Sequence, residues 1–367
     1  MHVLSVVGAR PNFMKVAPLL RALEARGHRS TLVHTGQHYD ANMSDAFFRD
    51  LQLPAPDHHL GVGSGSHSAQ TAAVMVAFEP VLAAAQPDVV VVVGDVNSTL
   101  ACALVCSKQL VPVAHVEAGL RSRDRSMPEE INRLVTDCVA DVLLTPSPDA
   151  DDNLRAEGVP AERVFQVGNI MIDSLVHGLE RARRSDVLTR LGVAAGGYGL
   201  VTLHRPSNVD DPAVLAGILA ALRDVAKRVP LVFPCHPRTR ARLPASFGVD
   251  DGVSVIEPLG YLDFMALVAG SRIVLTDSGG LQEETTWHRI PCVTLRTSTE
   301  RPITLTQGSN VLAGVEPRRI RELAFALLDA PRGAHPTPAL WDGQTAPRIV
   351  DVLERWHAQR TARQSSR

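Results

Sequence analysis

Short apolar runs alternate with longer stretches of helical periodicity along the first half of the chain. The runs are rich in valine and leucine, as in parallel strands that are buried on both faces. We expect strands at residues 2–7, 31–34, 89–93, 113–116 and 142–145. Between them, apolar residues recur at the three- and four-residue spacing of an amphipathic helix. We expect helices at residues 12–26, 44–51 and 68–86.

The same alternation continues in the second half. A helix at 171–184 leads into the glycine-rich sequence AAGGYG at residues 194–199, which is typical of a loose joint. Further strands are expected at residues 200–203, 231–233, 253–256, 272–275 and 292–294. Helices fall between them, for example at 212–228, and a last helix is expected at about 344–360.

Strands and helices that alternate in this way are typical of doubly wound α/β domains with parallel sheets. The length of 367 residues allows two such domains. We therefore expect two Rossmann-like lobes with a central cleft, the first at residues 1–170 and the second at 171–343. The last helix could pack back on the first lobe, and residues 361–367 are expected to form a flexible tail.

The composition narrows the class of protein. Hydrophobic residues make up 45% of the chain, charged residues 21%, and the formal net charge is −2. These values are typical of a soluble globular protein and suggest neither a nucleic-acid nor a membrane partner. The longest wholly apolar run is far shorter than the roughly 20 residues of a membrane helix, and the chain opens on a strand rather than a signal peptide. We expect a cytoplasmic protein.

The most informative stretch is TDSGGLQEE, residues 276–284. It joins a predicted strand to a predicted helix through Ser278, Gly279 and Gly280, which leave the backbone accessible. A helix N-terminus offers unpaired N–H groups and a partial positive charge, so this arrangement suits a phosphate. Glu284 lies one turn into the helix, within reach of ribose hydroxyls. We expect a nucleotide diphosphate here; the alternative is a plain strand-to-helix turn with an N-cap.

Polar side chains follow several other predicted strands, where open α/β sheets bind their ligands. The residues concerned are Arg10, Lys15, Asp95, His115, Glu117, His204, Arg205, His236 and Asp277. A carboxylate at the end of a buried strand carries a desolvation cost unless it is paired or used. Each group has a structural alternative: Asp95 or His204 could cap the next helix, and Glu117 could pair with Arg121 or Arg123.

Three further segments carry charged residues. In PEEINR, Glu129 and Glu130 fall in the first turn of a helix, and Arg133 follows Glu129 at the four-residue spacing of a helical ion pair. Arg301 in TERP follows a predicted strand and could rim the same cleft. The sequence DHH at 57–59 has no third partner at metal-ligand spacing, so we expect no metal site there.

Seven motifs together resemble, in order, those of the non-hydrolysing UDP-N-acetylglucosamine 2-epimerases. They are GARPNFMKVAPL, GDVNSTL, HVEAGLRS, PEEINR, LHRPSN, TDSGGLQEE and TERP, and the resemblance covers about residues 2–355. It implies two lobes of the glycosyltransferase-B type and reversible conversion of UDP-GlcNAc to UDP-ManNAc. It also implies a homodimer that uses neither a metal nor NAD, and hence no cofactor.

The resemblance assigns roles position by position. The catalytic residues that it implies are Asp95, Glu117, Glu129 and His204. The substrate-binding residues that it implies are Arg10, Lys15, Arg133, His236, Phe264, Ser278, Gly279, Gly280 and Glu284. To these we add Arg205 and Arg301, because they follow predicted strands. Among these, Phe264 matches a residue near the uracil and Glu284 matches the ribose ligand.

Three positions depart from the pattern of many relatives. Members that a second UDP-GlcNAc activates carry Gln-His-x-Gln and a downstream arginine. Gln37 is retained here, but Asp40 replaces the second glutamine and Ser66 stands nearest to the arginine position. Allosteric activation by the substrate is therefore in question. Asn12 stands where many relatives have glutamate.

The implied chemistry explains why these residue types occur. The C2 hydrogen becomes acidic only if UDP leaves C1, and its loss then gives a 2-acetamidoglucal. Donors and cations would stabilise the departing diphosphate, Asp95 and Glu117 would act on opposite faces of C2, and lobe closure would exclude water. The alternatives are a glycosyltransferase of the same type, a hydrolysing epimerase that releases ManNAc and UDP, and a catalytically silent nucleotide-sugar sensor.

Overall fold

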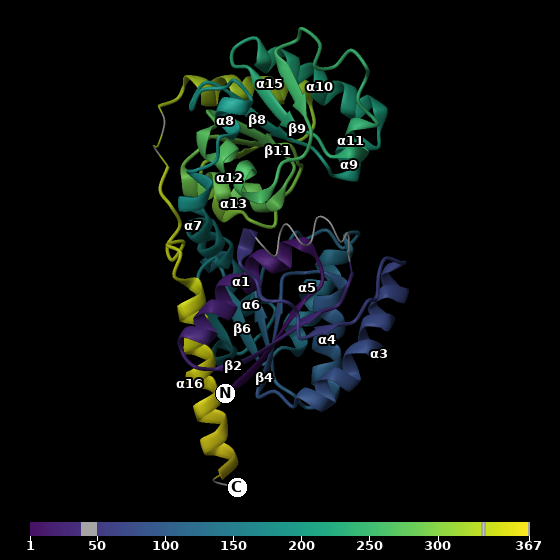
Figure 1. The fold of residues 1–367 in the computed structure, drawn as a ribbon, viewed down its shortest axis with the longest axis vertical. Coiled ribbons are helices and arrows are strands. Elements are labelled where there is room, and N and C mark those ends of the chain that lie inside the picture. Colours follow the sequence, from purple (N-terminus) through teal and green to yellow (C-terminus); the bar gives the residue numbers. More distant parts are fainter. Residues whose placement is uncertain (38–49, 332, 334, 366–367) are drawn as a thin grey trace. The chain divides into compact units, whose positions relative to one another are not determined.

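The computed structural model describes residues 1–37, 50–331, 333 and 335–365. Most of the helix predicted at 44–51 lies outside these residues, as do His38 and Asp40. The chain divides into two compact units, Met1–Ser174 with Ala339–Arg367, and Leu175–Pro338 (Figure 1). Each unit is described by itself below.

The first unit contains a seven-stranded parallel sheet in the order β3-β2-β1-β4-β5-β6-β7. Its strands are β1 (His2–Val7), β2 (Arg29–His34), β3 (His58–His59), β4 (Val89–Val93), β5 (Val113–Val116), β6 (Val142–Thr145) and β7 (Val164–Gln166). Its helices are α1 (Arg10–Ala25), α3 (His67–Ala85), α4 (Asn97–Lys108), α5 (Pro128–Val139), α6 (Pro148–Ala156), η1 (Ala161–Arg163) and α16 (Thr345–Ser365). The strand order reverses between β1 and β4, which is where such sheets bind ligands.

The second unit repeats this plan with six parallel strands in the order β10-β9-β8-β11-β12-β13. The strands are β8 (Gly199–Thr202), β9 (Leu231–Pro234), β10 (Val253–Ile256), β11 (Ile273–Thr276), β12 (Cys292–Thr294) and β13 (Asn310–Leu312). The helices are α8 (Val187–Arg190), α9 (Pro206–Val209), α10 (Pro212–Ala226), α11 (Pro237–Arg240), α12 (Tyr261–Gly270), α13 (Gly279–His288), α14 (Ile303–Thr306) and α15 (Pro317–Asp329). The order reverses between β8 and β11, and the predicted pair of doubly wound α/β lobes is confirmed.

Helices cover both faces of each sheet, and apolar side chains fill the layers between. In the first unit, all five valines of β4 are at most 1% exposed. Cys102 and Cys106 of α4 pack into the adjacent core as small apolar groups, and burial raises the pKa of both thiols. In the second unit, one cluster lies under α10 and α15, and another includes residues of α12 and α13. Burial on both faces explains why these strands read as continuous apolar runs.

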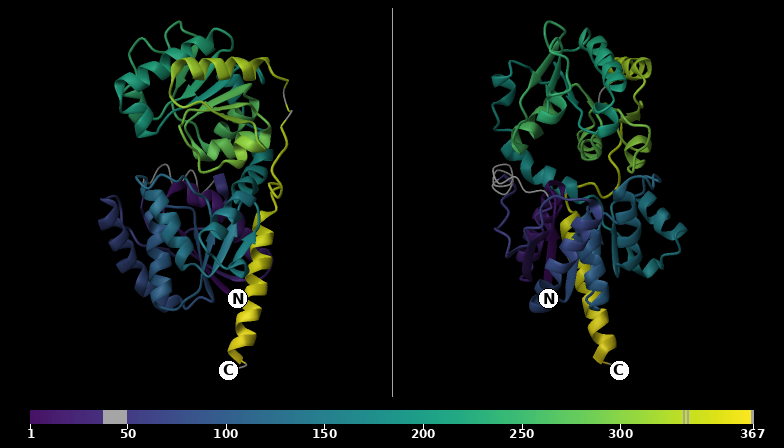
Figure 2. Two further views of the ribbon diagram at one scale, coloured as in Figure 1. Left: turned by 180° about the vertical axis from the view of Figure 1, so that it is seen from behind. Right: turned by 90° about the vertical axis from the view of Figure 1, so that its right-hand side faces the viewer.

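The last helix, α16, belongs to the first unit and runs alongside it (Figure 2). The Asp173 carboxylate accepts the backbone N–H groups of Thr345, at 3.0 Å, and Ala346, at 2.7 Å, and so fixes the start of this helix. Nearer the C-terminus, Glu354 pairs with His28 of the first unit at 2.8 Å. The predicted tail at 361–367 is wrong in part: α16 continues to Ser365, because this segment has helix-forming Ala, Arg and Gln and lacks Gly and Pro.

The glycine-rich segment at 194–199 is not a joint between the units. Gly196 donates to the Gly270 carbonyl at 2.7 Å, and the Tyr198 hydroxyl donates to the Leu267 carbonyl at 2.5 Å. Both contacts tie the segment to α12 inside the second unit. The chain instead passes from the first unit to the second within α7 (Ile170–Ala182), after Ser174.

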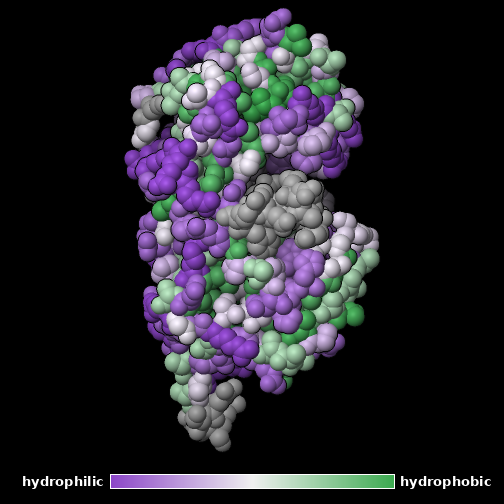
Figure 3. All heavy atoms as spheres, viewed as in Figure 1, coloured by the Kyte–Doolittle hydropathy of each residue, from purple (hydrophilic) through white to green (hydrophobic). Residues whose placement is uncertain are grey.

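One helix of the described chain, the 19-residue α3, is long and apolar enough to cross a membrane by length and composition alone. Val74, Phe78 and Leu82 on one of its faces pack into the core of the first unit. Its outer face is also apolar (Figure 3). Val76 of this helix is 74% exposed.

Candidate active site

The turn after β1 brings the chain against α4 and the end of β4. A Cβ atom on Gly8 would lie 2.4 Å from the Ser98 hydroxyl, so only glycine fits. The buried Asn12 side chain accepts the N–H groups of Gly8, at 3.1 Å, and Ala9, at 2.9 Å, and donates to the Val93 carbonyl at 3.1 Å. An amide can accept and donate at once, which an ionised glutamate cannot. Asn12 thus fixes the turn at the strand-order reversal.

The ion pair of Lys15 and Glu117 lies at this reversal. Lys15 on α1 contacts one oxygen of Glu117, which follows β5, and the two side chains are only 7% and 5% exposed. The backbone of Glu117 has φ of +69°, a left-handed conformation that is costly for a side chain of this kind. The other oxygen, Oε1, is buried without a hydrogen-bond partner among the residues that the structure describes. Glu117 is therefore anchored through one oxygen, and its second oxygen is available to a ligand.

Arg121 is not the partner of Glu117, contrary to the structural alternative. Its guanidinium binds Asp137 at 2.8 Å and both carboxylate oxygens of Glu157, at 2.8 and 2.6 Å. Burial alone would lower the pKa of Arg121, but the contacts with Glu157 and Asp137 raise it. Arg121 thus stays charged and holds the segment after β5 in place.

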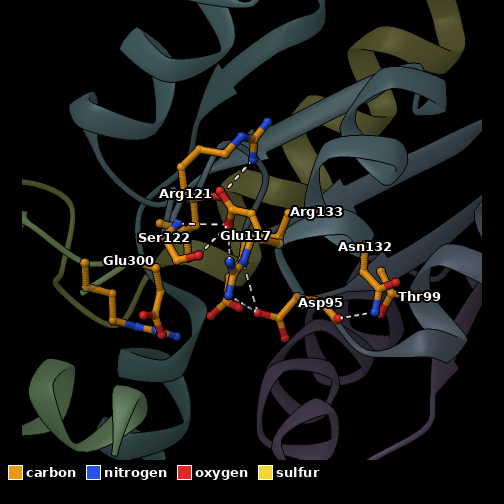
Figure 4. Close-up of polar contacts among 12 residues, drawn as sticks. Asp95, Thr99, Glu117, Arg121, Ser122, Asn132, Arg133 and Glu300 are labelled. Carbon is orange, nitrogen blue, oxygen red and sulfur yellow. Dashed lines mark hydrogen bonds and ion pairs between the residues drawn. The ribbon is translucent and has the colours of Figure 1, made fainter. Parts of the chain in front are cut away.

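Asp95 follows β4 and is held by two residues of α5. Arg133 donates to one Asp95 oxygen from two nitrogens, at 3.0 and 2.7 Å, and Asn132 donates to the Asp95 backbone carbonyl at 2.8 Å (Figure 4). The Asp95 side chain remains 32% exposed. The alternative that Asp95 merely caps α4 is wrong, because Val96 is the N-cap residue of this helix.

The two glutamates of the PEEINR motif have different surroundings. Glu130 is buried, accepts the N–H groups of Ser122 and Arg123, each at 2.9 Å, and pairs with Arg133 at 2.5 Å. Burial would raise the pKa of Glu130, but these donors lower it. Glu129 is half-buried in the first turn of α5, and within the described ranges its carboxylate has no recorded partner. The predicted Glu129–Arg133 pair is therefore wrong, because Arg133 binds the glutamate three residues before it.

A buried histidine supports these turns. His115 on β5 contacts Asp137 through Nδ1 at 2.6 Å and the Gly94 carbonyl through Nε2 at 2.8 Å. Asp137 also accepts the Gly119 N–H at 3.0 Å. Burial would raise the pKa of Asp137, but His115 and Arg121 hold it below its usual value. His115 is thus a structural residue that ties the turns before Asp95 and after Glu117 to α5.

The expected diphosphate turn of the second unit lies between β11 and α13. Ser278 is the N-cap residue with extended backbone, but its hydroxyl makes no capping hydrogen bond, which weakens the plain N-cap alternative. A Cβ atom on Gly279 would lie 2.8 Å from the Arg301 guanidinium and 2.9 Å from the Glu300 carboxylate, so a larger residue would displace these two side chains. The first N–H groups of α13 have no partner within the helix, as an anion site needs.

Arg301 is held beside this turn by a chain of buried ion pairs. It contacts Glu283 at 2.8 Å and Glu300, and Glu300 pairs with Arg296 at 2.8 Å. Burial would raise the pKa of Glu300, but the two arginines hold it well below its usual value. Arg301 is thus fixed close to Gly279 rather than extended into solvent.

Glu284 is an unpaired acid one turn into α13. Its Oε2 atom is buried and has no hydrogen-bond partner in the described part of the chain. Burial, with a smaller contribution from Glu283, raises the pKa of Glu284 to about 8. A ligand hydroxyl would provide the missing hydrogen bond.

His204 and Arg205 follow β8 and face the end of β11. The His204 Nδ1 atom lies 2.7 Å from an oxygen of the fully buried Asp277. Arg205 donates from Nε to the Asp277 carbonyl at 3.0 Å, and burial, with the charge of Arg296, lowers its pKa. The alternative that His204 caps a helix is wrong, because Arg205 is the N-cap residue of α9.

The remaining expected ligands are His236 and Phe264 in the second unit and Arg10 in the first. His236 follows β9, and its Nδ1 accepts the Arg238 N–H at 3.3 Å, so it caps the short α11. Phe264 on α12 is half-buried against the cluster that contains Leu281 of α13. Arg10 begins α1, and its side chain lies outside the described part of the structure.

The retained Gln37 and the departing Ser66 of the regulated pattern both have structural roles. Gln37 accepts from the N–H and the hydroxyl of Ser98, at 3.1 and 2.7 Å. Ser66 caps α3 by accepting the Ala69 N–H at 3.3 Å.

Within the described ranges, there is no group of three or more His, Cys, Asp or Glu residues that could hold a metal ion.

Two parallel sheets with this strand order define the fold as one of the glycosyltransferase-B type. A glycosyltransferase of kitacinnamycin shares it with a TM-score of 0.59 over 96% of this chain and 98% of that chain, although only 16% of residues are identical. At this identity the likeness concerns the fold alone.

Closer comparisons give the family. The family model described as UDP-N-acetylglucosamine 2-epimerase matches residues 21–354. A protein of that name from Methanocaldococcus jannaschii is 40% identical over 95% of this chain and 97% of its own. The crystal structure of the Methanocaldococcus jannaschii UDP-GlcNAc 2-epimerase with UDP-GlcNAc and UDP matches with a TM-score of 0.87, over 97% of this chain and 100% of that chain. The chain belongs to the UDP-N-acetylglucosamine 2-epimerase family.

A third relative carries a different name. The UDP-2,3-diacetamido-2,3-dideoxy-D-glucuronate 2-epimerase of Pseudomonas aeruginosa is 44% identical over 88% of this chain and 91% of its own. The family thus includes enzymes named for the same carbon of different UDP-sugars.

The raised pKa of Glu284 makes a prediction about stability. Glu284 keeps its proton up to a pH of about 8 in the folded protein, whereas the unfolded chain loses it near the ordinary value of 4.5. The free energy of unfolding should therefore fall as the pH rises from about 5 to about 8. Glu284→Gln should remove this loss, so that urea denaturation shows the variant gaining stability over the wild type as the pH rises. The exposed Glu24→Gln is the control, and a Glu284→Gln effect that is constant with pH would contradict the assignment.

Proposed function

We propose that this protein is a non-hydrolysing UDP-N-acetylglucosamine 2-epimerase that interconverts UDP-GlcNAc and UDP-ManNAc. The observation that carries the proposal is the anchored Glu117, with one oxygen bound by Lys15 and one buried oxygen without a partner in the described chain. The chain belongs to this epimerase family. The pair of Lys15 and Glu117 also lies at the strand-order reversal, where doubly wound sheets bind their ligands.

The reaction requires an acidic C2 hydrogen. No carbonyl lies beside C2, so the hydrogen is not acidic in the substrate. When UDP leaves with the electrons of the C1–O bond, positive charge develops at C1 and C2–H becomes acidic. Loss of that proton gives a 2-acetamidoglucal. A proton added to the other face of C2, with return of UDP to C1, completes the inversion.

The residues of the second unit suit the UDP moiety. The N–H groups of Ser278, Gly279 and Gly280, with His204, Arg205 and Arg301, would stabilise the charge that develops on the diphosphate. Glu284 would bind the ribose, because its buried carboxyl needs a hydrogen-bond partner, and Phe264 would lie near the uracil. His236 would be a further ligand in this unit.

The residues of the first unit suit the proton transfers. Asp95 and Glu117 would exchange protons with the two faces of C2. Arg133 orients Asp95, and Lys15 orients Glu117. Glu129, which is half-buried without a partner in the described ranges, would relay a proton. Arg10 would help to neutralise the diphosphate.

The rival functions differ in their products. A glycosyltransferase would need an acceptor and no carboxylates at C2, a hydrolysing epimerase would release ManNAc and UDP, and a sensor would leave UDP-GlcNAc unchanged. The names of the relatives at about 40% identity support the epimerase. Incubation with UDP-GlcNAc alone separates the epimerase and the hydrolysing epimerase from each other and from the other two functions, which both leave the substrate unchanged.

We also infer a cytoplasmic homodimer. The five cysteines are free, as is usual in a reducing compartment, and four of them are buried. The homodimer rests on the family resemblance.

A second candidate substrate is UDP-2,3-diacetamido-2,3-dideoxy-D-glucuronate, because the Pseudomonas aeruginosa relative named for it has the higher identity. Epimerisation at C2 needs the same carboxylates for either sugar. We expect kcat/KM to be higher for UDP-GlcNAc when both are assayed side by side. A higher value for the diacetamido sugar would move the assignment to that substrate.

Loss of either carboxylate at C2 should stop catalysis without loss of UDP binding. Asp95→Asn and Glu117→Gln should each lower kcat by about 10²–10⁴-fold, the usual contribution of a positioned acid or base. UDP affinity, measured by calorimetry, should stay within a few-fold of wild type. The exposed Glu162→Gln is a control that should keep full activity. Near wild-type turnover in either variant would remove that residue from the mechanism.

The elimination route also predicts exchange with solvent. In D₂O, deuterium should appear at C2 of both UDP-GlcNAc and UDP-ManNAc recovered during turnover, as followed by proton NMR. UDP-ManNAc formed without deuterium would rule out proton exchange with the solvent.

A further inference from the structure

Asp277 is a buried carboxylate that contacts both the backbone and the ring of His204. It follows β11, is fully buried, and accepts the backbone N–H groups of His204, at 3.0 Å, and Arg205, at 2.9 Å. The amide of Asn208 adds a weaker contact at 3.3 Å. One carboxylate oxygen lies 2.7 Å from Nδ1 of His204. Asp277 thus fixes both the backbone and the ring of His204.

The hydrogen-bond pattern determines which ring nitrogen of His204 carries the proton next to Asp277. Burial would raise the pKa of Asp277. His204 and the backbone N–H donors outweigh burial, so the pKa of Asp277 is lowered. An ionised carboxylate can only accept, so His204 must donate from Nδ1. The His204 side chain is 55% exposed, whereas the Asp277 side chain is inaccessible. Nε2 is therefore the ring nitrogen available to a ligand.

Resting on the proposed function, we propose that Asp277 is the positioning residue of His204: it binds Nδ1–H and so holds the ring with Nε2 toward the diphosphate of the UDP-sugar. From this position, a proton on Nε2 stabilises the charge that develops as the C1–O bond breaks. No proton is transferred in this role. Asp277 acts through His204 and need not touch the substrate.

The other charged groups near the pair do not replace Asp277. Arg205, which follows His204, lies among Arg296, Glu300 and Arg301. Arg296 and Arg301 are already paired with glutamates. Among the residues that the structure describes, Asp277 is the carboxylate in contact with the ring, so its removal should change which ring nitrogen carries the proton.

The wild-type protein offers a direct test. Neutral histidine in water prefers the tautomer with the proton on Nε2, whereas the pair with Asp277 requires it on Nδ1. Nitrogen-15 NMR of the full chain, with the His204 signals identified through His204→Gln, should show that Nε2 loses its proton first as the pH rises. This readout requires no catalysis. Loss of the Nδ1 proton first would overturn the proposal.

Asp277→Asn tests the link to catalysis. The Asn carbonyl can still accept backbone N–H groups, but its amide presents N–H to Nδ1 and so favours the tautomer with the proton on Nε2. The nitrogen-15 signals of neutral His204 should therefore change to that tautomer, and kcat should fall while KM changes little. An unchanged tautomer or an unchanged kcat would overturn the role of Asp277, and absence of epimerisation in the wild type would overturn the proposed function instead.

Asp173→Asn is the matched control. Asp173 is likewise a buried aspartate that accepts two backbone N–H groups, from Thr345 and Ala346, but it lies in the first unit. A structural loss alone should lower stability in both variants, measured by thermal denaturation. Only Asp277→Asn should change the tautomer of His204; the same change in Asp173→Asn would overturn the specific role. If Asp277→Asn does not fold, the nitrogen-15 NMR of His204 in the wild-type protein still tests the proposal.

Discussion

The cost of desolvating a carboxylate at the end of a buried parallel strand shapes both units. Such a group needs a cation or several N–H donors. Asp95 has Arg133, Glu117 has Lys15, and Asp277 has His204 with two backbone N–H groups. The paired groups hold the turns in place. Two of the buried carboxylate oxygens that lack a partner in the described chain, one on Glu117 and one on Glu284, are those for which we propose a substrate contact.

Both sheets reverse their strand order between the first and fourth of their strands in sequence order. These strands are β1 and β4 in one unit, and β8 and β11 in the other. The side chains at these two points differ in kind. The first unit gathers Asp95 and Glu117, whereas the second gathers His204 and the start of α13. We propose that this difference divides the reaction: one unit carries the groups for proton transfer at C2, and the other those for the UDP leaving group.

Much of this fold follows from local sequence. Strands β4, β5, β6, β10 and β12 begin and end where their apolar runs predict. The sequence did not predict β3, β7 and β13, which have only two or three residues and depend on a neighbouring strand for their hydrogen bonds. The glycine-rich segment at 194–199 was misjudged because its contacts with α12 are made by residues about 70 positions away in the sequence.

The candidate site was less predictable than the fold. Motif positions indicated which side chains follow the strands, but not which pairs form. Arg133 binds Asp95 because the β4 turn lies beside α5, a tertiary fact that helical spacing does not contain. Helical spacing allows Arg133 to pair with either Glu129 or Glu130, and the structure shows the pair with Glu130. The roles of Asn12 and Asp277 likewise depend on hydrogen bonds to backbone groups of other segments. TDSGG contains Asp277, yet only its contact with His204 indicates a role.

The central claim is that UDP leaves C1 during epimerisation. Oxygen-18 placed in the bridge between C1 and the β-phosphate reports this directly, because a freed diphosphate can return through a different oxygen. The account predicts that phosphorus NMR of the recovered UDP-sugars shows the label moving from the bridge to non-bridging positions of the β-phosphate during turnover. UDP-ManNAc that forms while all the label stays in the bridge would contradict it.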